Sequence, residues 1–259
     1  MFKNQRHFEI IEILKKETFV GVKDLSDRLY ASQPTIRRDL DSLEKQGYVR
    51  RNHGGAMLAD DKTHTPISFR KGTNIKEKIS ICRMAATLIK SGSLIFTDAS
   101  TTAFHLSNFI RQDDNITVVT NGYSICHALA EKNIITFSTG GRLLKNSMAF
   151  VGEQAKESIR QFNADIMFFS ASSLSKNGII SDYSEEETAL RKEMKKHSHD
   201  TVFLCDNTKI GVSSAFRVFS LEEIDHIITD AELPNELANY CNLKLTNHFD
   251  NAYLYSHTV

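Results

Sequence analysis

Two adjacent arginines, Arg37 and Arg38, follow a set of short polar residues near the start of the chain. A guanidinium group can donate two hydrogen bonds to O6 and N7 of guanine or pair with a phosphate, and a threonine hydroxyl can bind a phosphate or touch a thymine methyl group. These residue types suit the floor and walls of a DNA major groove, and a surface helix with solvated charges is the simpler alternative. The candidate DNA-contacting residues of this stretch are Ser32, Gln33, Thr35, Arg37 and Arg38.

A second group of short polar residues follows three apolar runs farther along the chain. The loops at 98–102, 120–122 and 139–142 read DASTT, TNG and TGGR. A hydroxyl-rich loop that leads into a helix offers free amides, hydroxyl donors and the positive end of the helix dipole, which together hold an anion such as phosphate. Ser100 and Asn121 could instead be simple helix caps. Three such loops after successive strands favour a binding site.

The arginine pair requires a helix to present it. Ile36, Leu40 and Leu43 recur at helical spacing, and Ser32 can cap the first turn. Two shorter helices are expected before it, over 8–16 and 23–29, with a break at 19–22. This order of a helix, a short helix, a tight turn and a basic helix is typical of a helix-turn-helix unit. Asp39 is expected to pair with a neighbouring cation, because its charge would repel phosphate.

A polar, glycine-containing segment follows this helix at 47–56. Its first residues suit a strand, and Gly54 and Gly55 allow a tight hairpin. The pattern predicts a winged variant in which Arg50, Arg51 and His53 contact the sugar-phosphate backbone. A solvated turn is the alternative interpretation of these three residues.

The remainder of the chain alternates helical patterns with short apolar runs. Such runs predict a parallel sheet covered by helices on both faces, which is a doubly wound α/β fold. We expect a DNA-binding domain over 1–57, a linker over 58–74 and an α/β ligand-sensing domain over 75–259. Expected strands lie at 94–96, 116–119, 134–137, 166–169, 202–204 and 227–228.

Composition agrees with two domains. The chain has 259 residues, of which 41% are hydrophobic and 25% charged, with a net charge of zero. Residues 1–57 carry 11 basic and 8 acidic side chains, and the rest carry 21 and 24, so a basic head precedes a mildly acidic body. No apolar run is long enough to span a bilayer, which predicts a cytoplasmic protein without a membrane partner. The four cysteines are scattered, so we expect reduced thiols, no metal site and no cofactor.

The string TIRRDLDSLEKQGYVRRNHGGA, preceded by DLSDRL, resembles the signature of the DeoR family of bacterial transcription regulators. The resemblance implies a winged helix-turn-helix domain that binds double-stranded operator DNA. It places Thr35, Arg37 and Arg38 on the reading helix, without saying which arginine reads a base.

The body resembles the C-terminal sensor domain of the same family, which is related to ribose-phosphate isomerase and CoA-transferase folds and usually senses a phosphorylated sugar. Ser100 stands where the family usually has glycine, and Arg191 where it usually has lysine. The resemblance implies that Lys209 binds phosphate and that Asp98 accepts sugar hydroxyls or orients Lys209. The ligand-binding residues that it implies are Asp98, Ser100, Thr101, Thr102, Thr120, Asn121, Gly140, Gly141, Glu187, Arg191, Asp206 and Lys209.

Together these features predict a repressor of a carbohydrate catabolic operon that responds to a phosphorylated sugar and has no catalytic residues. A homodimer or homotetramer is expected, because helix-turn-helix proteins gain specificity by binding two half-sites. The main alternative is a sugar-phosphate isomerase-like enzyme with a DNA-binding head, which would use carboxylates among Asp98, Asp182, Glu187 and Asp206. A third possibility is an architectural DNA binder that takes no ligand.

Overall fold

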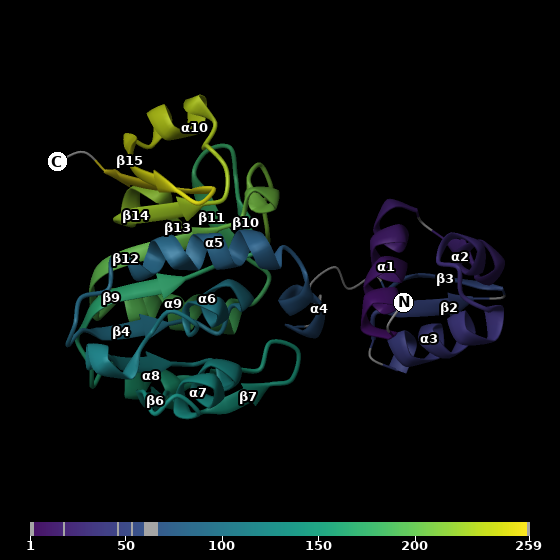
Figure 1. The fold of residues 1–259 in the computed structure, drawn as a ribbon, viewed down its shortest axis with the longest axis horizontal. Helices are drawn as coiled ribbons and strands as arrows, with labels where there is room; N and C mark the ends of the chain where they lie inside the picture. The colour runs from purple at the N-terminus through teal and green to yellow at the C-terminus, as the bar shows by residue number, and fades with distance from the viewer. Residues whose placement is uncertain (1–2, 18, 46, 53, 60–66, 258–259) are drawn as a thin grey trace. The chain divides into compact units, whose positions relative to one another are not determined.

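The computed structural model describes residues 3–17, 19–45, 47–52, 54–59 and 67–257. The chain divides into two compact units, Met1–Thr65 and Pro66–Val259 (Figure 1). Each unit has its own hydrophobic core. Among the described residues, every helix is too short or too polar to cross a bilayer.

The first unit is a winged helix-turn-helix, as the sequence predicts. Its three helices are α1 (Lys3–Lys16), α2 (Val22–Arg28) and α3 (Gln33–Lys45). Its antiparallel sheet has the order β1 (Val20–Gly21), β3 (Gly55–Leu58) and β2 (Val49–Asn52). Leu25, Ile36, Leu40 and Leu43 are fully buried, so the apolar stripe of α3 faces the core and its charged side faces solvent.

The second unit is built on an eight-stranded sheet whose strand order is β15-β16-β14-β12-β9-β4-β5-β6. The six strands from β14 to β6 run parallel, and β16 and β15 add an antiparallel edge. The six predicted apolar runs all form strands of this sheet, which confirms the doubly wound, mostly parallel fold. The eight strands are β4 (Leu94–Thr97), β5 (Thr117–Thr120), β6 (Ile135–Ser138), β9 (Ala164–Phe169), β12 (Ser198–Cys205), β14 (His226–Thr229), β15 (Leu243–Phe249) and β16 (Ala252–His257).

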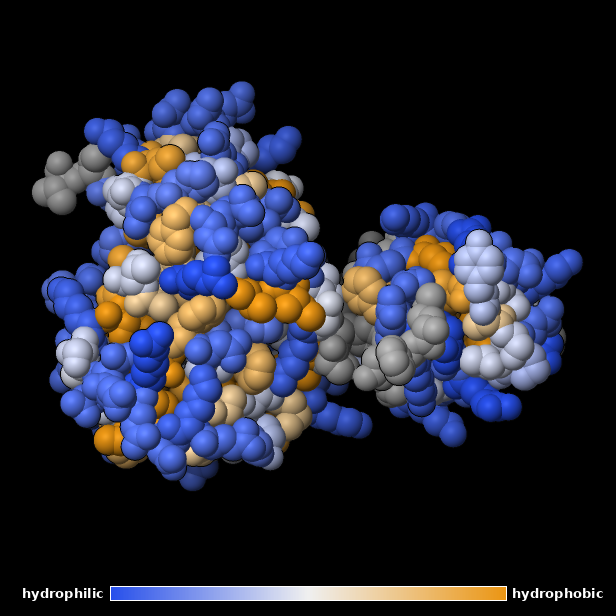
Figure 2. Space-filling model, in the orientation of Figure 1, coloured by the Kyte–Doolittle hydropathy of each residue, from blue (hydrophilic) through white to orange (hydrophobic). Residues whose placement is uncertain are grey.

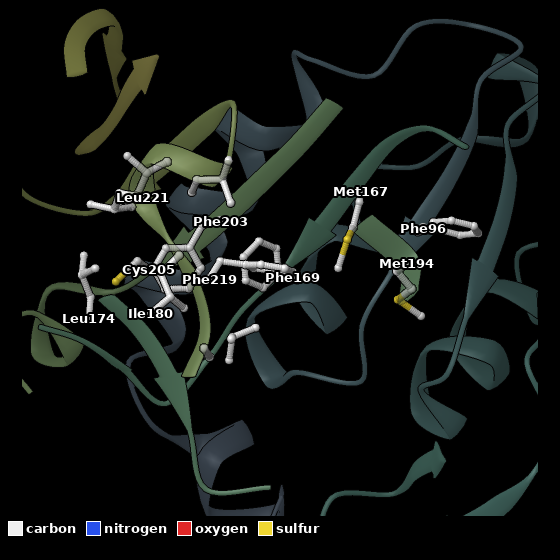
Figure 3. Packing of buried hydrophobic residues seen from close by; sticks show 14 of the residues in the cluster. Phe96, Met167, Phe169, Leu174, Ile180, Met194, Phe203, Cys205, Phe219 and Leu221 are labelled. Atoms are coloured by element: carbon white, nitrogen blue, oxygen red, sulfur yellow. The ribbon is translucent and has the colours of Figure 1, made fainter. Parts of the chain in front are cut away.

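Helices cover both faces of this sheet. Successive strand residues point to opposite faces, so Phe168 packs with α5, α6 and α7, whereas Met167 and Phe169 pack with α8, α9 and α10. The rings of Phe203 and Phe219 lie 5.2 and 5.3 Å from that of Phe169 (Figure 3). The helices are α4 (Ile67–Gly72), α5 (Ile75–Ala86), α6 (Thr101–Leu106), α7 (Tyr123–Ala130), α8 (Glu153–Ile159), α9 (Glu185–Lys196) and α10 (Asn235–Tyr240).

Two smaller sheets flank the main one, and the sequence patterns did not predict them. One has the order β10-β11-β13 and the other pairs β7 with β8. On the face drawn in Figure 2, hydrophilic residues predominate, with hydrophobic groups between them. The strands of the small sheets are β7 (Arg142–Leu144), β8 (Ala149–Val151), β10 (Ser173–Leu174), β11 (Ile179–Asp182) and β13 (Phe216–Ser220).

Helix α4 falls inside the segment 58–74 that was expected to be a linker. Its first residue donates a backbone hydrogen bond to Asn146 of the second unit, from Ile67 N to Asn146 O at 3.0 Å. The side chain of Lys71 donates to Ser124 Oγ at 3.0 Å and lies over the Phe104 ring at 4.4 Å. The boundary between the compact units accordingly falls at Thr65–Pro66, before α4.

Candidate functional site

Helix α3 presents the candidate DNA-reading residues on its outer face. Gln33, Arg37 and Arg38 are exposed, and Thr35 is half-buried. Ser32 accepts a hydrogen bond from Thr35 N at 3.4 Å, and the two hydroxyl oxygens lie 2.9 Å apart. This bond satisfies a free amide of the first turn. The exposed guanidinium groups are therefore carried on a capped helix whose opposite side is held in the core.

Asp39 lies on the buried side of α3 and joins it to α1. Arg6 donates to both carboxylate oxygens of Asp39, from Nε at 2.5 Å and from Nη2 at 3.2 Å, and His7 Nε2 lies 3.0 Å from Oδ1. The expected pairing of Asp39 with a cation is thus present, with partners 32 and 33 residues earlier in the chain. Burial lowers the pKa of His7.

The wing carries Arg50 and Arg51 on β2, where both are exposed. Arg51 is attached to α3 at two points: its backbone N donates to Glu44 Oε1 at 2.8 Å, and its guanidinium pairs with Asp41. These bonds fix the wing strand β2 against helix α3. The third expected wing contact, His53, lies outside the described residues.

In the second unit, the candidate ligand residues Asp98 and Asp206 lie at the carboxyl ends of neighbouring parallel strands, together with Ser170, which the sequence patterns did not single out. Asp98 follows β4, Ser170 follows β9 and Asp206 follows β12. From β4 the chain adds β5 and β6 on one side and then β9, β12 and β14 on the other, so β4 and β9 flank the point where the winding reverses. Doubly wound sheets bind their ligands in the crevice at such a point.

Arg191, on α9, is the centre of a buried ion-pair network at this edge. Its Nε donates to Asp98 Oδ2 at 2.7 Å, and its Nη1 donates to Asp182 Oδ2 at 2.8 Å. A longer contact of 3.5 Å joins Nη2 to Glu187 Oε2. Arg191 is 4% exposed, and the three carboxylates keep its pKa raised despite its burial. The planar guanidinium group contacts each of the three carboxylates from a different nitrogen.

Lys209 is held beside this network by Ser170 and Asp206. Its Nζ donates to Ser170 Oγ at 2.8 Å and lies 3.2 Å from Asp206 Oδ2. Asp98 accepts a hydrogen bond from Ser170 N at 3.4 Å. The Lys209 ammonium is therefore contacted by Asp206 and Ser170, and one of the two roles expected for Asp98, the orientation of Lys209, belongs to them. The cation that Asp98 contacts is Arg191.

The loop after β4 combines a helix cap with buried hydroxyl groups. Ser100 caps α6 by accepting from Ala103 N at 3.1 Å, and its own N donates to Asp98 Oδ1 at 3.2 Å. Thr101 and Thr102 are both buried. In the described part of the chain, Thr102 Oγ1 has no hydrogen-bond partner. A buried oxygen atom without a partner is costly, so the hydrogen-bonding capacity of this hydroxyl is unused.

The loop after β5 differs from the simple cap that was the alternative interpretation. Asn121 donates from Nδ2 to Phe150 O at 3.1 Å, and Gly122 is the residue that precedes α7. Thr120 Oγ1 accepts from Gly122 N at 3.0 Å. The buried Oδ1 of Asn121 has no partner among the described residues, so a second acceptor is available at this edge.

Gly140 and Gly141 follow β6, and both have positive φ angles, of 62° and 101°. A Cβ atom on Gly141 would lie 2.6 Å from Val151 O. Close packing against β8 therefore accounts for this glycine without any ligand.

Lys78 is a cation of this edge that the sequence patterns did not single out. It is buried on α5, and its Nζ donates to Thr101 Oγ1 at 3.2 Å. Its spacing from Ile81 and Cys82 places it on the apolar side of the helix, which is the signal that could have identified it.

In the described part of the chain, no group of three His, Cys, Asp or Glu side chains is arranged to hold a metal ion.

Models of known protein families match both units of the chain. The model of the DeoR-like helix-turn-helix domain matches residues 6–62, and that of the DeoR C-terminal sensor domain matches residues 73–231. The chain belongs to the DeoR family. It is a DNA-binding transcription regulator, as the resemblance predicted.

Curated relatives match this DeoR-family regulator over most of its length. The HTH-type transcriptional regulator YulB of Bacillus subtilis (strain 168) is 35% identical over 235 residues, which are 90% of this chain and 91% of that protein. The glycerol-3-phosphate regulon repressor of Escherichia coli (strain K12) is 30% identical over 90% of this chain and 93% of its own length. Among solved structures, ribose 5-phosphate isomerase A of Methanocaldococcus jannaschii aligns with a TM-score of 0.41 at 16% identity, covering 53% of this chain and 55% of that chain.

Proposed function

We propose that this DeoR-family regulator represses a carbohydrate catabolic operon and that a phosphorylated sugar bound in its second unit controls its binding to operator DNA. The observation that carries the proposal is the position of Lys209, held by Ser170 and Asp206 at the reversal point of the sheet. Unpartnered buried oxygens of Thr102 and Asn121 belong to the adjoining loops. A cation with hydroxyl and amide groups around it is the chemistry that a sugar phosphate requires.

In this proposal the second unit senses its ligand and does not convert it. Isomerisation of a sugar phosphate needs a general base, which works best with a pKa near the operating pH. Asp98, Asp182 and Glu187 all bind Arg191, and Asp206 binds Lys209. These cations help to lower the pKa of Asp182 and of Asp206 against the opposing effect of burial. Carboxylates held ionised in this way are weak bases.

The name of one relative supports the class of effector, since the glycerol-3-phosphate regulon repressor is named for a phosphorylated polyol regulon. We further propose that the regulator acts as a homodimer or homotetramer. Two reading helices in one assembly would contact two half-sites, and the ligand would alter their affinity for the pair.

A thermal-shift screen of phosphorylated metabolites tests the effector. A ligand present at about 100 times its dissociation constant adds about 2.7 kcal/mol to the free energy of unfolding, so a true effector raises the melting temperature measurably. Its unphosphorylated parent sugar is the control and is expected to have little effect. A screen in which no sugar phosphate changes the melting temperature would contradict effector control, and turnover of a pentose or hexose phosphate that Lys209→Ala abolishes would favour an enzyme.

A further inference from the structure

Tyr30 lies in the turn between α2 and α3, and its backbone is left-handed, with a φ of 49°. A Cβ atom is unfavourable in this region, so glycine, asparagine and aspartate are its usual occupants. In the described part of the chain, six of the eight non-glycine residues with a positive φ are asparagine or aspartate, and the other two are Tyr30 and Met148. A large aromatic residue at this position is therefore an exception to the pattern of the chain.

Hydrogen bonds on both sides of Tyr30 fix the turn that holds it. Leu29 N donates to Leu25 O at 3.0 Å, and Ala31 N donates to Ser26 O at 3.2 Å. Ser26 Oγ in turn donates to Ala31 O at 2.6 Å. The bond from Ala31 N is that of a Schellman motif, in which Tyr30 occupies the position that glycine usually fills. The turn therefore imposes the left-handed conformation on Tyr30.

The Tyr30 side chain gains almost no packing within the chain to offset this strain. Tyr30 is 96% exposed, although the residue before it, Leu29, is buried. Met148, the other large residue with a positive φ, is half-buried and so has neighbours. A strained conformation that is kept without a contact inside the protein indicates a contact with another molecule.

The position of Tyr30 relative to α3 indicates which molecule this is. Tyr30 precedes Ser32, the cap of α3, by two residues, and two residues of extended chain span at most about 7 Å. The N-terminal residues of such a helix enter the major groove, which is about 12 Å wide and has a phosphate backbone on each side. Arg28, which precedes the turn, already pairs with Glu17 and Asp24. The Tyr30 hydroxyl is thus a donor that the turn can offer to a phosphate.

We propose that the Tyr30 hydroxyl donates a hydrogen bond to a backbone phosphate at the edge of the major groove that α3 enters. Tyrosine is among the side chains that bind phosphate oxygens in protein–DNA complexes, and such contacts set the position of the protein without reading sequence. The assignment concerns DNA binding alone, so it holds whether or not a sugar phosphate controls the protein.

Tyr30→Phe in the full-length protein removes the hydroxyl and keeps the ring. The probes are a mixed-sequence duplex of about 30 base pairs and an operator duplex selected from random DNA, titrated by fluorescence anisotropy at several salt concentrations. Affinity is expected to fall by about tenfold on both duplexes, because a hydrogen bond to a charged group is lost. The salt dependence should stay the same, since no cation leaves the interface, whereas Arg51→Ala is expected to reduce it.

Tyr30→Gly separates a DNA contact from a structural role. Glycine adopts the left-handed conformation without strain, so the amides of α3 are expected to exchange with deuterium about two- to fivefold more slowly than in the unmodified protein. DNA affinity should nevertheless fall as it does in Tyr30→Phe. A structural role of the side chain would instead make α3 exchange faster in the Tyr30→Gly variant, and this result would contradict the proposal.

The matched control is Tyr240→Phe, because Tyr240 is a 63% exposed tyrosine of the second unit, and it should bind both duplexes as the unmodified protein does. Unchanged affinity of Tyr30→Phe for both duplexes would overturn the assignment. A loss on the operator alone would indicate a base contact and contradict a phosphate contact. A changed molecular mass of the Tyr30→Gly assembly in light scattering would place the side chain between copies of the chain and would also overturn the assignment.

Discussion

Arg191 donates a hydrogen bond from Nε to Asp98 Oδ2 across 2.7 Å, and this pair joins helix α9 to the end of strand β4. Both side chains are buried. Ser184 caps α9 by accepting a hydrogen bond from Glu187 N at 3.2 Å, and three glutamates lie in the first turn of this helix. Both features stabilise the N-terminus of the helix that carries Arg191. The Arg191 network therefore connects α9, the end of β4 and strand β11 of the small sheet at the proposed ligand site.

Replacing Arg191 by methionine is expected to lower the free energy of unfolding by about 3–5 kcal/mol, because its three carboxylate partners would remain buried without their cation. Arg191→Lys should cost less, since it keeps the charge. Urea unfolding followed by circular dichroism measures both. The control is Lys192→Met, an exposed neighbour on the same helix, expected to lie within about 0.5 kcal/mol of the unmodified protein. Equal stability of the Arg191→Met variant would show that the network is dispensable.

Phosphate affinity is expected to fall as the pH rises above about 8. The Lys78 ammonium, whose pKa is lowered to about 8 in the ligand-free protein, loses its proton there, and a neutral amine attracts the anion less. Between about pH 7 and pH 8 the ammonium stays charged and the phosphate remains largely doubly ionised, so the affinity is retained. The groups that act on Lys78 are Lys209, Asp206, Arg70 and Cys82.

Calorimetric titrations with inorganic phosphate across this range measure the effect. The Lys78→Arg variant is the reference, because a guanidinium group keeps its charge well above pH 8. Identical pH profiles for the two proteins would rule out titration of Lys78 as the cause.

Asp39→Asn is expected to lower the free energy of unfolding of the first unit. Removal of one partner from a buried ion pair typically costs about 3 kcal/mol or more, which corresponds to roughly a hundred-fold faster hydrogen exchange of the α3 amides if these exchange by opening of the unit. Hydrogen–deuterium exchange by mass spectrometry resolves this unit from the second one. The control, Asp27→Asn on α2, alters an exposed aspartate and should leave exchange unchanged. If the amides of α3 exchange at the same rate in the Asp39→Asn variant, the Arg6–Asp39 pair does not hold the helix.

Arg37→Ala and Arg38→Ala are each expected to cost about 1–3 kcal/mol on a specific operator duplex, with a smaller loss on scrambled DNA. Arg51→Ala should weaken binding to both duplexes alike and reduce the salt dependence by about one unit of slope. Fluorescence anisotropy titrations at several salt concentrations measure these differences, with the exposed Arg111 of the second unit mutated to alanine as the control. Equal losses on both duplexes for Arg37, Arg38 and Arg51 variants would contradict base reading by α3.

Most of the fold was predicted from patterns that span only a few consecutive residues. The apolar stripe through Ile36, Leu40 and Leu43 identified α3, and runs such as 166–169 identified the parallel strands, since both signals lie within a few residues of sequence. Strands β15 and β16 were missed because they form an antiparallel edge, and β15 is largely exposed, so its residues alternate weakly in hydrophobicity. The small sheet of β10, β11 and β13 gives a weak pattern, because β10 has only two residues and Arg217 interrupts the apolar residues of β13.

The site was harder to predict than the fold. Asp98 and Arg191 are 93 residues apart in the chain, and no local pattern reports which carboxylates a distant helix will meet. Arg191 was expected to act on the ligand, whereas in the folded chain its guanidinium binds three carboxylates. Lys78 has the residue type of a solvated surface charge, and the tertiary structure shows that its ammonium donates to Thr101 on α6 and to the Arg70 carbonyl.

Control of operator binding by a sugar phosphate is tested most directly by titrating operator DNA with the full-length protein in the presence and absence of each sugar phosphate that raises its melting temperature. Typical coupling free energies of about 1–3 kcal/mol predict a change of roughly 5- to 150-fold in the dissociation constant, which the unphosphorylated sugar should not produce and Lys209→Met should abolish. An operator dissociation constant that stays the same with every such compound would contradict the account.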